Sequence, residues 1–185
     1  MENTATNKSK VFDMVLIAMF AVLIAICSWT SIPSTIPFTL QTFGVFCAVG
    51  LLGGKRGTLS VLIYILLGAV GLPVFAGFKG GIGALLGPTG GYIVGFLFTA
   101  LVMWIFTHFF GEKTVSLIIA MILGLFICYA FGTIWFVIVY SKANGAIGIM
   151  QALSWCVIPY LIPDALKIAL AFALVKLIPK KFLNR

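Results

Sequence analysis

Charged residues are scarce in this chain of 185 residues, and acidic residues are the scarcest of them. Asp, Glu, Lys and Arg together make up 9% of the sequence, whereas a soluble domain has about a quarter. Hydrophobic residues make up 62%, and the mean hydropathy is +1.21. This composition excludes an ordinary soluble domain and predicts an integral membrane protein. Because a transmembrane helix needs about 20 apolar residues, the length allows roughly six spans and no second domain.

The residue patterns that many enzymes need are also missing. His108 is the single histidine, so no Ser/His/Asp set and no metal-ligand cluster can be assembled. The stretch GLLGGKRGT has its glycines and lysine in the wrong frame for a phosphate-binding loop. Cys27, Cys47, Cys128 and Cys156 lie in apolar segments without C-x-x-C spacing, which indicates packing residues. The sequence therefore predicts no enzyme activity, no metal site and no cofactor in this chain.

Six apolar segments predict an all-α integral membrane protein, a bundle of six transmembrane helices. The segments span residues 11–29, 39–54, 58–76, 90–110, 114–140 and 163–178. They form a single transmembrane domain, 11–179, between a polar N-terminal tail, 1–10, and a basic C-terminal tail, 180–185. The connection before the last segment has room for a short interfacial helix in its middle.

The basic residues predict which way the chain crosses the membrane. If the N-terminus is inside, the outer side carries two of them, Lys79 and Lys142. The inner set is Lys8, Lys10, Lys55, Arg56, Lys113, Lys176, Lys180, Lys181 and Arg185. This bias predicts that both termini are cytoplasmic, and it explains the net charge of +8 without nucleic-acid binding. The outer connections are long and rich in Gly, Pro and aromatics, so a site is expected on the outer face.

The apolar stretch IPYLIPDALKIALAFALVKLI carries two charges, Asp164 and Lys167, in the first turn after Pro163, whereas Lys176 near its end belongs to the inner basic set. A charge at mid-helix costs about 2.5–3.5 kcal/mol on insertion scales, so such residues indicate a functional site. Residues three apart share a helix face, so both side chains can enter one cavity. Pro163 suits the first helical position, and a helix N-terminus favours a carboxylate. The alternative is structural: Asp164 caps the helix and pairs with Lys167.

Further candidates are polar or aromatic residues near the outer ends of other segments. Thr39, Gln41 and Thr42 open the second segment, where the alternative is a solvated helix start. Tyr92 belongs either to an interfacial aromatic belt or to a pocket. Phe75 lies in an outer loop, where it belongs either to such an aromatic belt or to an apolar lid over a ligand.

Small residues at helical spacing indicate close helix packing. Gly91 and Gly95 form a G-x-x-x-G pair in the fourth segment. Ala18, Ala21 and Ala25 lie on one stripe of the first helix, and the last two form A-x-x-x-A. A second helix can approach this stripe closely, and it belongs either to this chain or to a partner.

Three stretches resemble the BioY family: PFTLQTFGVFCAVGLLGGKRGTLSVLIYILLGAVGLPVFAG, GGIGALLGPTGGYIVGF and PDALKIALA. The resemblance runs in order from about residue 12 to about residue 178, and Lys79 departs from it. BioY proteins are the biotin-specific substrate-binding (S) components of energy-coupling factor (ECF) transporters. The resemblance implies a six-helix bundle in the cell membrane that binds biotin from outside. It also implies partners: a transmembrane coupling subunit, which the alanine stripe contacts, and two ATPase subunits that use the ATP.

On this resemblance we expect Asp164 to accept hydrogen bonds from the ureido N–H groups of biotin. Lys167 then donates to the ureido carbonyl or, alternatively, pairs with the carboxylate. Four more residues are predicted contacts, three polar and one an apolar wall: Gln41, Thr39, Tyr92 and Phe75. Two rival functions stay open, a solo biotin carrier that works without ATPase partners and a ligand-free membrane scaffold in which the charged pair is structural.

Overall fold

Helices make up most of the chain in the computed structural model, which describes residues 2–34 and 36–179, with side chains from residue 10 onward. The helices are α1 (Glu2–Trp29), α2 (Gln41–Leu52), α3 (Gly54–Ala69), α4 (Ile82–Leu86), α5 (Gly90–Phe110), α6 (Thr114–Asn144), α7 (Ile149–Cys156) and α8 (Leu161–Leu177). A short 3-10 turn, η1 (Ile158–Tyr160), precedes α8. Two short strands, β1 (Ser31–Ile32) and β2 (Phe38–Thr39), pair antiparallel between α1 and α2.

The predicted all-helical membrane architecture is confirmed, since each predicted apolar segment contains a helix: α1, α2, α3, α5, α6 and α8. Four stretches of the described chain are long and apolar enough to cross a membrane: Lys10–Trp29, Gly90–Phe110, Thr114–Asn144 and Ile149–Leu177. The expected short helix before the last segment is present as α7. The helices α2 and α3 have only 12 and 16 residues, so length alone does not define them as full crossings.

Several helix boundaries differ from the prediction, and glycine explains most of the differences. Gly53 has a φ of 80°, and α3 restarts directly after it, so the predicted charged turn is largely the first turn of α3. Helix α3 ends at Ala69 because Gly71, with a φ of 112°, and Pro73 break the continuation. Helix α6 extends beyond the predicted end at residue 140 to Asn144, and the next residue, Gly145, has a φ of 90°.

The two chain ends differ from the predicted tails in what the structure describes. Helix α1 begins at Glu2, so the backbone of the predicted N-terminal tail is helical from residue 2. The predicted basic tail, 180–185, lies outside the described residues. Pro163 is the third residue of α8 and not the first, as predicted. Proline fits there because the first-turn N–H groups have no acceptor within the helix.

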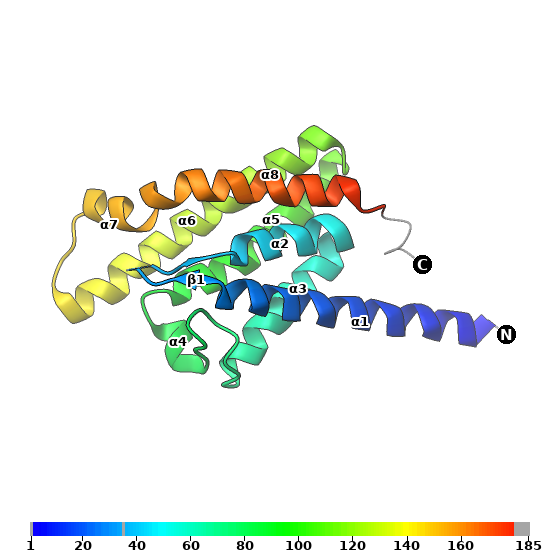
Figure 1. Ribbon diagram of the computed structural model, residues 1–185, viewed down its shortest axis with the longest axis horizontal. Helices are drawn as coiled ribbons and strands as arrows, with labels where there is room; N and C mark the ends of the chain where they lie inside the picture. Colours follow the sequence, from blue (N-terminus) through cyan, green and yellow to red (C-terminus); the bar gives the residue numbers. More distant parts are fainter. Residues whose placement is uncertain (1, 35, 180–185) are drawn as a thin grey trace.

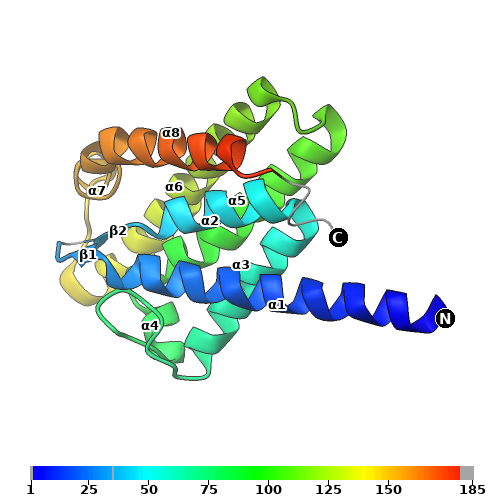
Figure 2. The same cartoon turned by 45° about the vertical axis from the view of Figure 1, so that its right-hand side comes forward.

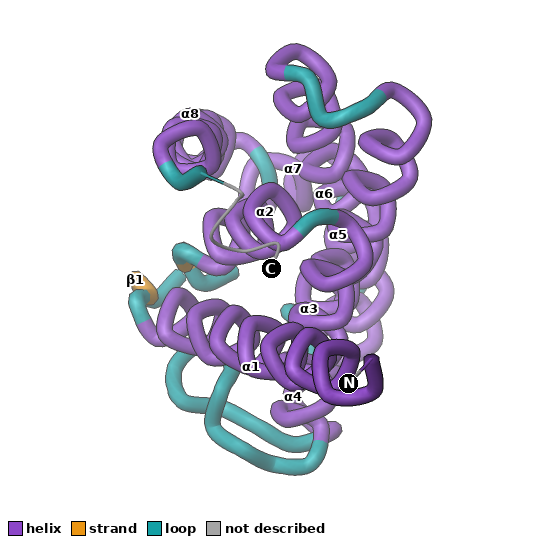
Figure 3. Tube along the Cα trace, turned by 90° about the vertical axis from the view of Figure 1, so that its right-hand side faces the viewer, coloured by secondary structure: helices purple, strands orange, loops and turns teal. Residues whose placement is uncertain are grey.

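Figure 3 views α8 nearly end-on, whereas α1 crosses the view at an angle. Helices α5 and α6 share the largest interface, and the G-x-x-x-G pair lies in it, as predicted. A Cβ atom at Gly91 would lie 2.2 Å from Cβ of Trp135, and one at Gly95 would lie 3.0 Å from Sγ of Cys128. Glycine at both positions therefore lets the two helix backbones approach closely.

The connections gather at one end of the bundle, which we call the loop end. Figures 1 and 2 show β1, α4 and α7 there, whereas the start of α1 and the end of α8 lie at the opposite end. Two hydrogen bonds fasten the 70–81 loop to the end of α1: Ser28 Oγ donates to the carbonyl oxygen of Val74 (2.5 Å), and Trp29 Nε1 donates to that of Pro73 (2.8 Å). The loop is thus held over the interior of the bundle.

Candidate ligand-binding site

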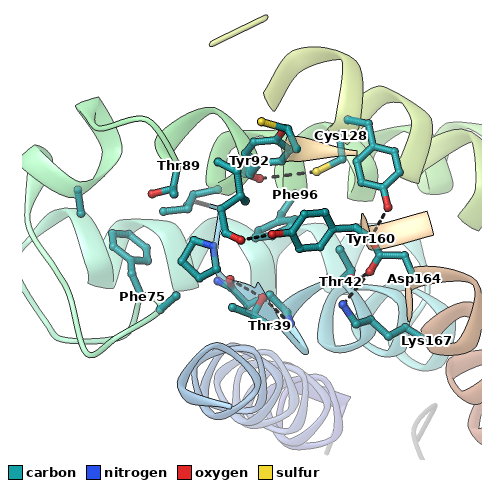
Figure 4. Close-up of a pocket in the computed structure, with 18 of the residues that line it drawn as sticks. Thr39, Thr42, Phe75, Thr89, Tyr92, Phe96, Cys128, Tyr160, Asp164 and Lys167 are labelled. Atoms are coloured by element: carbon teal, nitrogen blue, oxygen red, sulfur yellow. Dashed lines mark hydrogen bonds and ion pairs between the residues drawn. The ribbon is translucent and has the colours of Figure 1, made fainter. Parts of the chain in front are cut away.

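A cavity lies inside the bundle, lined by residues of α2, α5, α6 and α8 and by the connections of the loop end. Its wall contains every residue that the sequence predicted as a substrate contact: Thr39, Gln41, Phe75, Tyr92, Asp164 and Lys167. Figure 4 shows most of them pointing toward the same space from different elements. Their placement around one cavity is a finding, whereas their contacts with a substrate stay predictions.

The most strongly polar part of the wall is centred on the Asp164 carboxylate, of which 4% of the side-chain surface is exposed. The Lys167 ammonium donates to Oδ1 (2.7 Å), and the Thr42 hydroxyl donates to the same oxygen (3.1 Å). The hydroxyl of Tyr129 donates to Oδ2. Donors from three helices, α2, α6 and α8, therefore hold this carboxylate in place and offset the cost of burying its charge.

Lys167 is also buried, and its ammonium lies 4.3 Å from the centre of the Phe38 ring. This cation–π contact and the ion pair fix the ammonium at the cavity wall. An ammonium has three N–H donors, and among the described residues the hydrogen bond of Lys167 goes to Asp164. Lys167 can therefore donate to an acceptor on a ligand without giving up its ion pair.

The structural alternative for this pair is supported in one part only. The pairing of Asp164 with Lys167 is present, but Asp164 does not cap α8. It lies in the first turn, where the helix N-terminus favours a carboxylate, and the residue at the cap position is Tyr160. Its hydrogen bonds go to side chains of the cavity wall, so the pair belongs to the cavity as well as to the helix.

Thr39 and Gln41 do not form a solvated helix start, because 9% and 5% of their surfaces are exposed. The Thr39 hydroxyl donates to Oε1 of Gln41 (2.9 Å), and the amide Nε2 of Gln41 donates to the hydroxyl of Tyr64 (2.5 Å). Tyr64 is fully buried on α3. This hydrogen-bonded chain fixes the Gln41 amide at the cavity wall.

Tyr92 and Phe75 are pocket residues and not members of an exposed aromatic belt, since both are buried. The hydroxyl of Tyr92 shares a hydrogen bond with that of Thr133 (2.9 Å), which holds the side chain in place at the cavity wall. Phe75 packs edge-on against Tyr64, with ring centroids 5.6 Å apart. The Phe75 ring lies so close to Gly68 that a Cβ atom there would be 2.0 Å away.

Sequence reasoning missed several residues of the wall. Tyr129 was inconspicuous within a long apolar segment, although a buried tyrosine hydroxyl usually needs a partner, which is a signal. Tyr160 donates its hydroxyl to the backbone oxygen of Ile36 and stacks on Phe38, with ring centroids 6.3 Å apart. Cys128 and Cys156 also line the cavity. Both are buried, as the packing interpretation requires.

The three alanines of the stripe on α1 differ in how far they are buried. Ala21 and Ala25 are 1% and 4% exposed, so the A-x-x-x-A pair packs within this chain and is not open to a partner. Ala18 is exposed at the edge of the buried face of α1 and lines a shallow apolar groove with Val15 and Met19. Of the predicted docking residues, only Ala18 is therefore accessible to another subunit in this structure.

The fold of this chain, compared with solved structures, defines its class. Its fold matches the crystal structure of the S-component for biotin from an ECF-type ABC transporter, with a TM-score of 0.82 and 28% sequence identity. The match covers 97% of this chain and 94% of that chain. With its apolar helices, the chain is a multi-pass membrane protein of the transporter class and not an enzyme.

The family follows from the sequence. The model of the BioY family matches residues 1–184, and the chain belongs to this family. The biotin transporter BioY of Thermotoga maritima is 42% identical over 167 residues, which are 88% of this chain and 92% of the relative. The probable biotin transporter BioY of Pyrococcus horikoshii is 37% identical over 163 residues, 88% of this chain and 93% of the relative. The resemblance identified from the sequence is thus confirmed.

Proposed function

We propose that this chain binds biotin with high affinity from the outer side of the cell membrane, as the substrate-specific subunit of an ECF-type ABC transporter. The names of its relatives and the likeness to a biotin S-component support this function. The single structural observation that carries it is the cavity, in which a buried carboxylate and a buried ammonium lie side by side.

The chemistry of the cavity fits biotin. The ureido ring has two N–H donors and one carbonyl acceptor, and the sulfur ring and chain are apolar. A carboxylate has about four acceptor positions, and three donors occupy positions on Asp164. A ureido N–H takes the remaining position or replaces Thr42, while the Lys167 ammonium donates to the ureido carbonyl. Phe75 and the ring of Tyr92 supply apolar contacts for the rest of the molecule.

The proposed topology has six crossings, made by α1, α2, α3, α5, α6 and α8. Most Lys and Arg residues lie on the same side of the bundle as the two termini, which supports a cytoplasmic position for that side. The loop end then lies outside. Biotin then enters from the loop end. Labelling cysteines introduced at each terminus with a membrane-impermeant reagent tests the orientation.

ATP hydrolysis belongs to partners in this proposal. The coupling subunit docks on the groove beside Ala18, and two ATPase subunits supply the energy, so this chain needs no cofactor. The apolar lining and the exposure of the groove support docking of another membrane helix there.

Thermal unfolding of the purified chain tests the ligand directly. Biotin is expected to raise the melting temperature because a ligand that binds only the folded state stabilises it. Lipoic acid is the matched control, since it has the same acid chain but no ureido ring, and we expect no comparable shift. No shift with biotin would contradict the proposal and favour a ligand-free scaffold. Equal shifts with both compounds would contradict recognition of the ureido ring.

A further inference from the structure

The cavity has two ends with different charge. Figure 4 shows Phe75 and Thr89 on one side and Asp164 with Lys167 on the other, with Tyr160 between them. A second lysine, Lys79, lines the cavity, and its backbone pairs with that of Phe75. The cavity therefore has one cation at the α8 end and another at the end formed by the 70–81 loop.

The ammonium at the α8 end is already neutralised. Lys167 pairs with Asp164 at 2.7 Å, and both side chains are buried. A ligand carboxylate placed there would give two buried carboxylates and one ammonium, which leaves a negative charge uncompensated at a high desolvation cost. The α8 end consequently favours a neutral hydrogen-bonding group over an anionic one.

Lys79 has the opposite properties. Its side chain is exposed, and within residues 10–34 and 36–179 it has no carboxylate partner. Its backbone is well held, because Phe75 N–H donates to the Lys79 carbonyl (2.9 Å) and the Lys79 N–H donates back (3.3 Å). Trp29 stacks on Phe78, with ring centroids 5.3 Å apart, and fastens the tip of the same loop. A fixed backbone thus holds Lys79 at the cavity wall, and its ammonium has no carboxylate partner among the described residues.

The backbone of this tip is also unusual. Phe78 has a φ of 56°, a conformation that is rare for a bulky residue and that only the surrounding contacts sustain. This conformation lies directly before Lys79 and sets the direction in which the chain presents it. Such strain is typical of loops that hold a functional side chain.

We infer that Lys79 pairs with the carboxylate of the ligand, so that the acid chain points toward the 70–81 loop and the ureido ring toward Asp164 and Lys167. This inference rests on the proposed function and adds the orientation of the substrate. It gives a role to the residue that departs from the family pattern. It also assigns the buried pair to the ureido ring and not to the carboxylate.

Biotin and biotinamide, in which a neutral amide replaces the carboxylate, distinguish the two ends. Calorimetric titration of the purified full-length chain is expected to show tighter binding of biotin than of biotinamide. Lys79→Gln is expected to weaken biotin binding about fivefold, since an exposed ion pair contributes little more. The same substitution leaves the affinity for biotinamide unchanged. Lys79→Arg keeps the preference for biotin.

Lys142→Gln is the matched control, because Lys142 is exposed and does not line the cavity. This substitution removes one positive charge, and the variant chain should bind biotin and biotinamide with the affinities of the unmodified chain. A Lys79→Gln chain that retains the preference, or that loses affinity for both compounds equally, overturns the inference. Equal affinity of the unmodified chain for the two compounds overturns it too and leaves biotin binding standing. Binding of neither compound overturns the proposed function and this inference with it.

Discussion

At the scale of single residues, the site depends on how completely Asp164 is hydrogen-bonded. Its carboxylate accepts from Lys167, Thr42 and Tyr129, and all of these groups line the cavity. The sequence predicted Asp164 and Lys167 because charge is rare in apolar segments. It did not predict Tyr129 as a partner, because the two residues lie 35 positions apart and only the fold brings them together.

Asp164→Asn is expected to weaken biotin binding at least about tenfold. The amide offers one acceptor and one donor where the carboxylate offers two acceptors, and it leaves the Lys167 ammonium buried without a counter-charge. Titration calorimetry on the purified variant measures the loss.

Asp13→Asn is the matched control for this substitution. Asp13 forms an ion pair with Arg56 at 3.0 Å and does not line the cavity. The Asp13→Asn chain should bind biotin with the same affinity as the unmodified chain. Unchanged affinity in the Asp164→Asn chain would remove Asp164 from the biotin site.

At the scale of elements, the 70–81 loop links the end of α1 to the cavity wall. Phe75 inserts from this loop against Tyr64 of α3, and the absence of a side chain at Gly68 makes room for its ring. The hydrogen bonds from Ser28 and Trp29 hold the loop from the other side. Packing of Phe75 therefore decides both the loop position and one wall of the site.

Gly68→Ala is expected to lower the melting temperature and to weaken biotin binding. The new Cβ atom would lie 2.0 Å from the Phe75 ring, and overpacking of this kind costs about 1–3 kcal/mol. Alanine favours a helix more than glycine does, so a loss of stability would be steric in origin. Thermal unfolding with and without biotin measures both effects.

The control for Gly68→Ala is Gly83→Ala on α4, where an added Cβ atom meets nothing within 4 Å. This variant should bind biotin as the unmodified chain does and unfold at the same or a slightly higher temperature. If the two variants behave alike, the close contact between Gly68 and Phe75 does not shape the site.

At the scale of the whole molecule, burial separates the ligand site from the surface available to partners. The A-x-x-x-A pair faces the inside of the chain, whereas Ala18 and its groove lie on the outer surface of α1. Docking on this groove leaves the cavity wall untouched, since the two share no residue.

Ala18→Trp should therefore leave biotin binding intact and abolish ATP-dependent uptake into vesicles that also contain the partner subunits. The indole would fill the groove that the coupling subunit needs. Ile134→Trp is the control, because Ile134 is 62% exposed on α6, outside this groove. Normal uptake by the Ala18→Trp chain would exclude docking at this groove. Uptake of biotin by the unmodified chain in vesicles without partner subunits would favour a solo carrier.

The sequence by itself determined the membrane class, the helical segments, the G-x-x-x-G packing and the charged pair. These features depend on composition and on spacing within one helix, both of which are local. Apolar runs without water must satisfy their backbone groups internally, so they form helices whatever surrounds them. A carboxylate and an ammonium three residues apart share a face by helix geometry alone.

Only the tertiary structure decided which residues meet across helices. It placed Tyr129, Thr42 and Asp164 together, turned Ala21 inward, and set the 70–81 loop with Lys79 at the cavity. A helix that is apolar on all sides gives no pattern that distinguishes a lipid-facing side from a buried one. Which side is buried follows from close packing of neighbouring helices, and glycine and alanine permit that approach here.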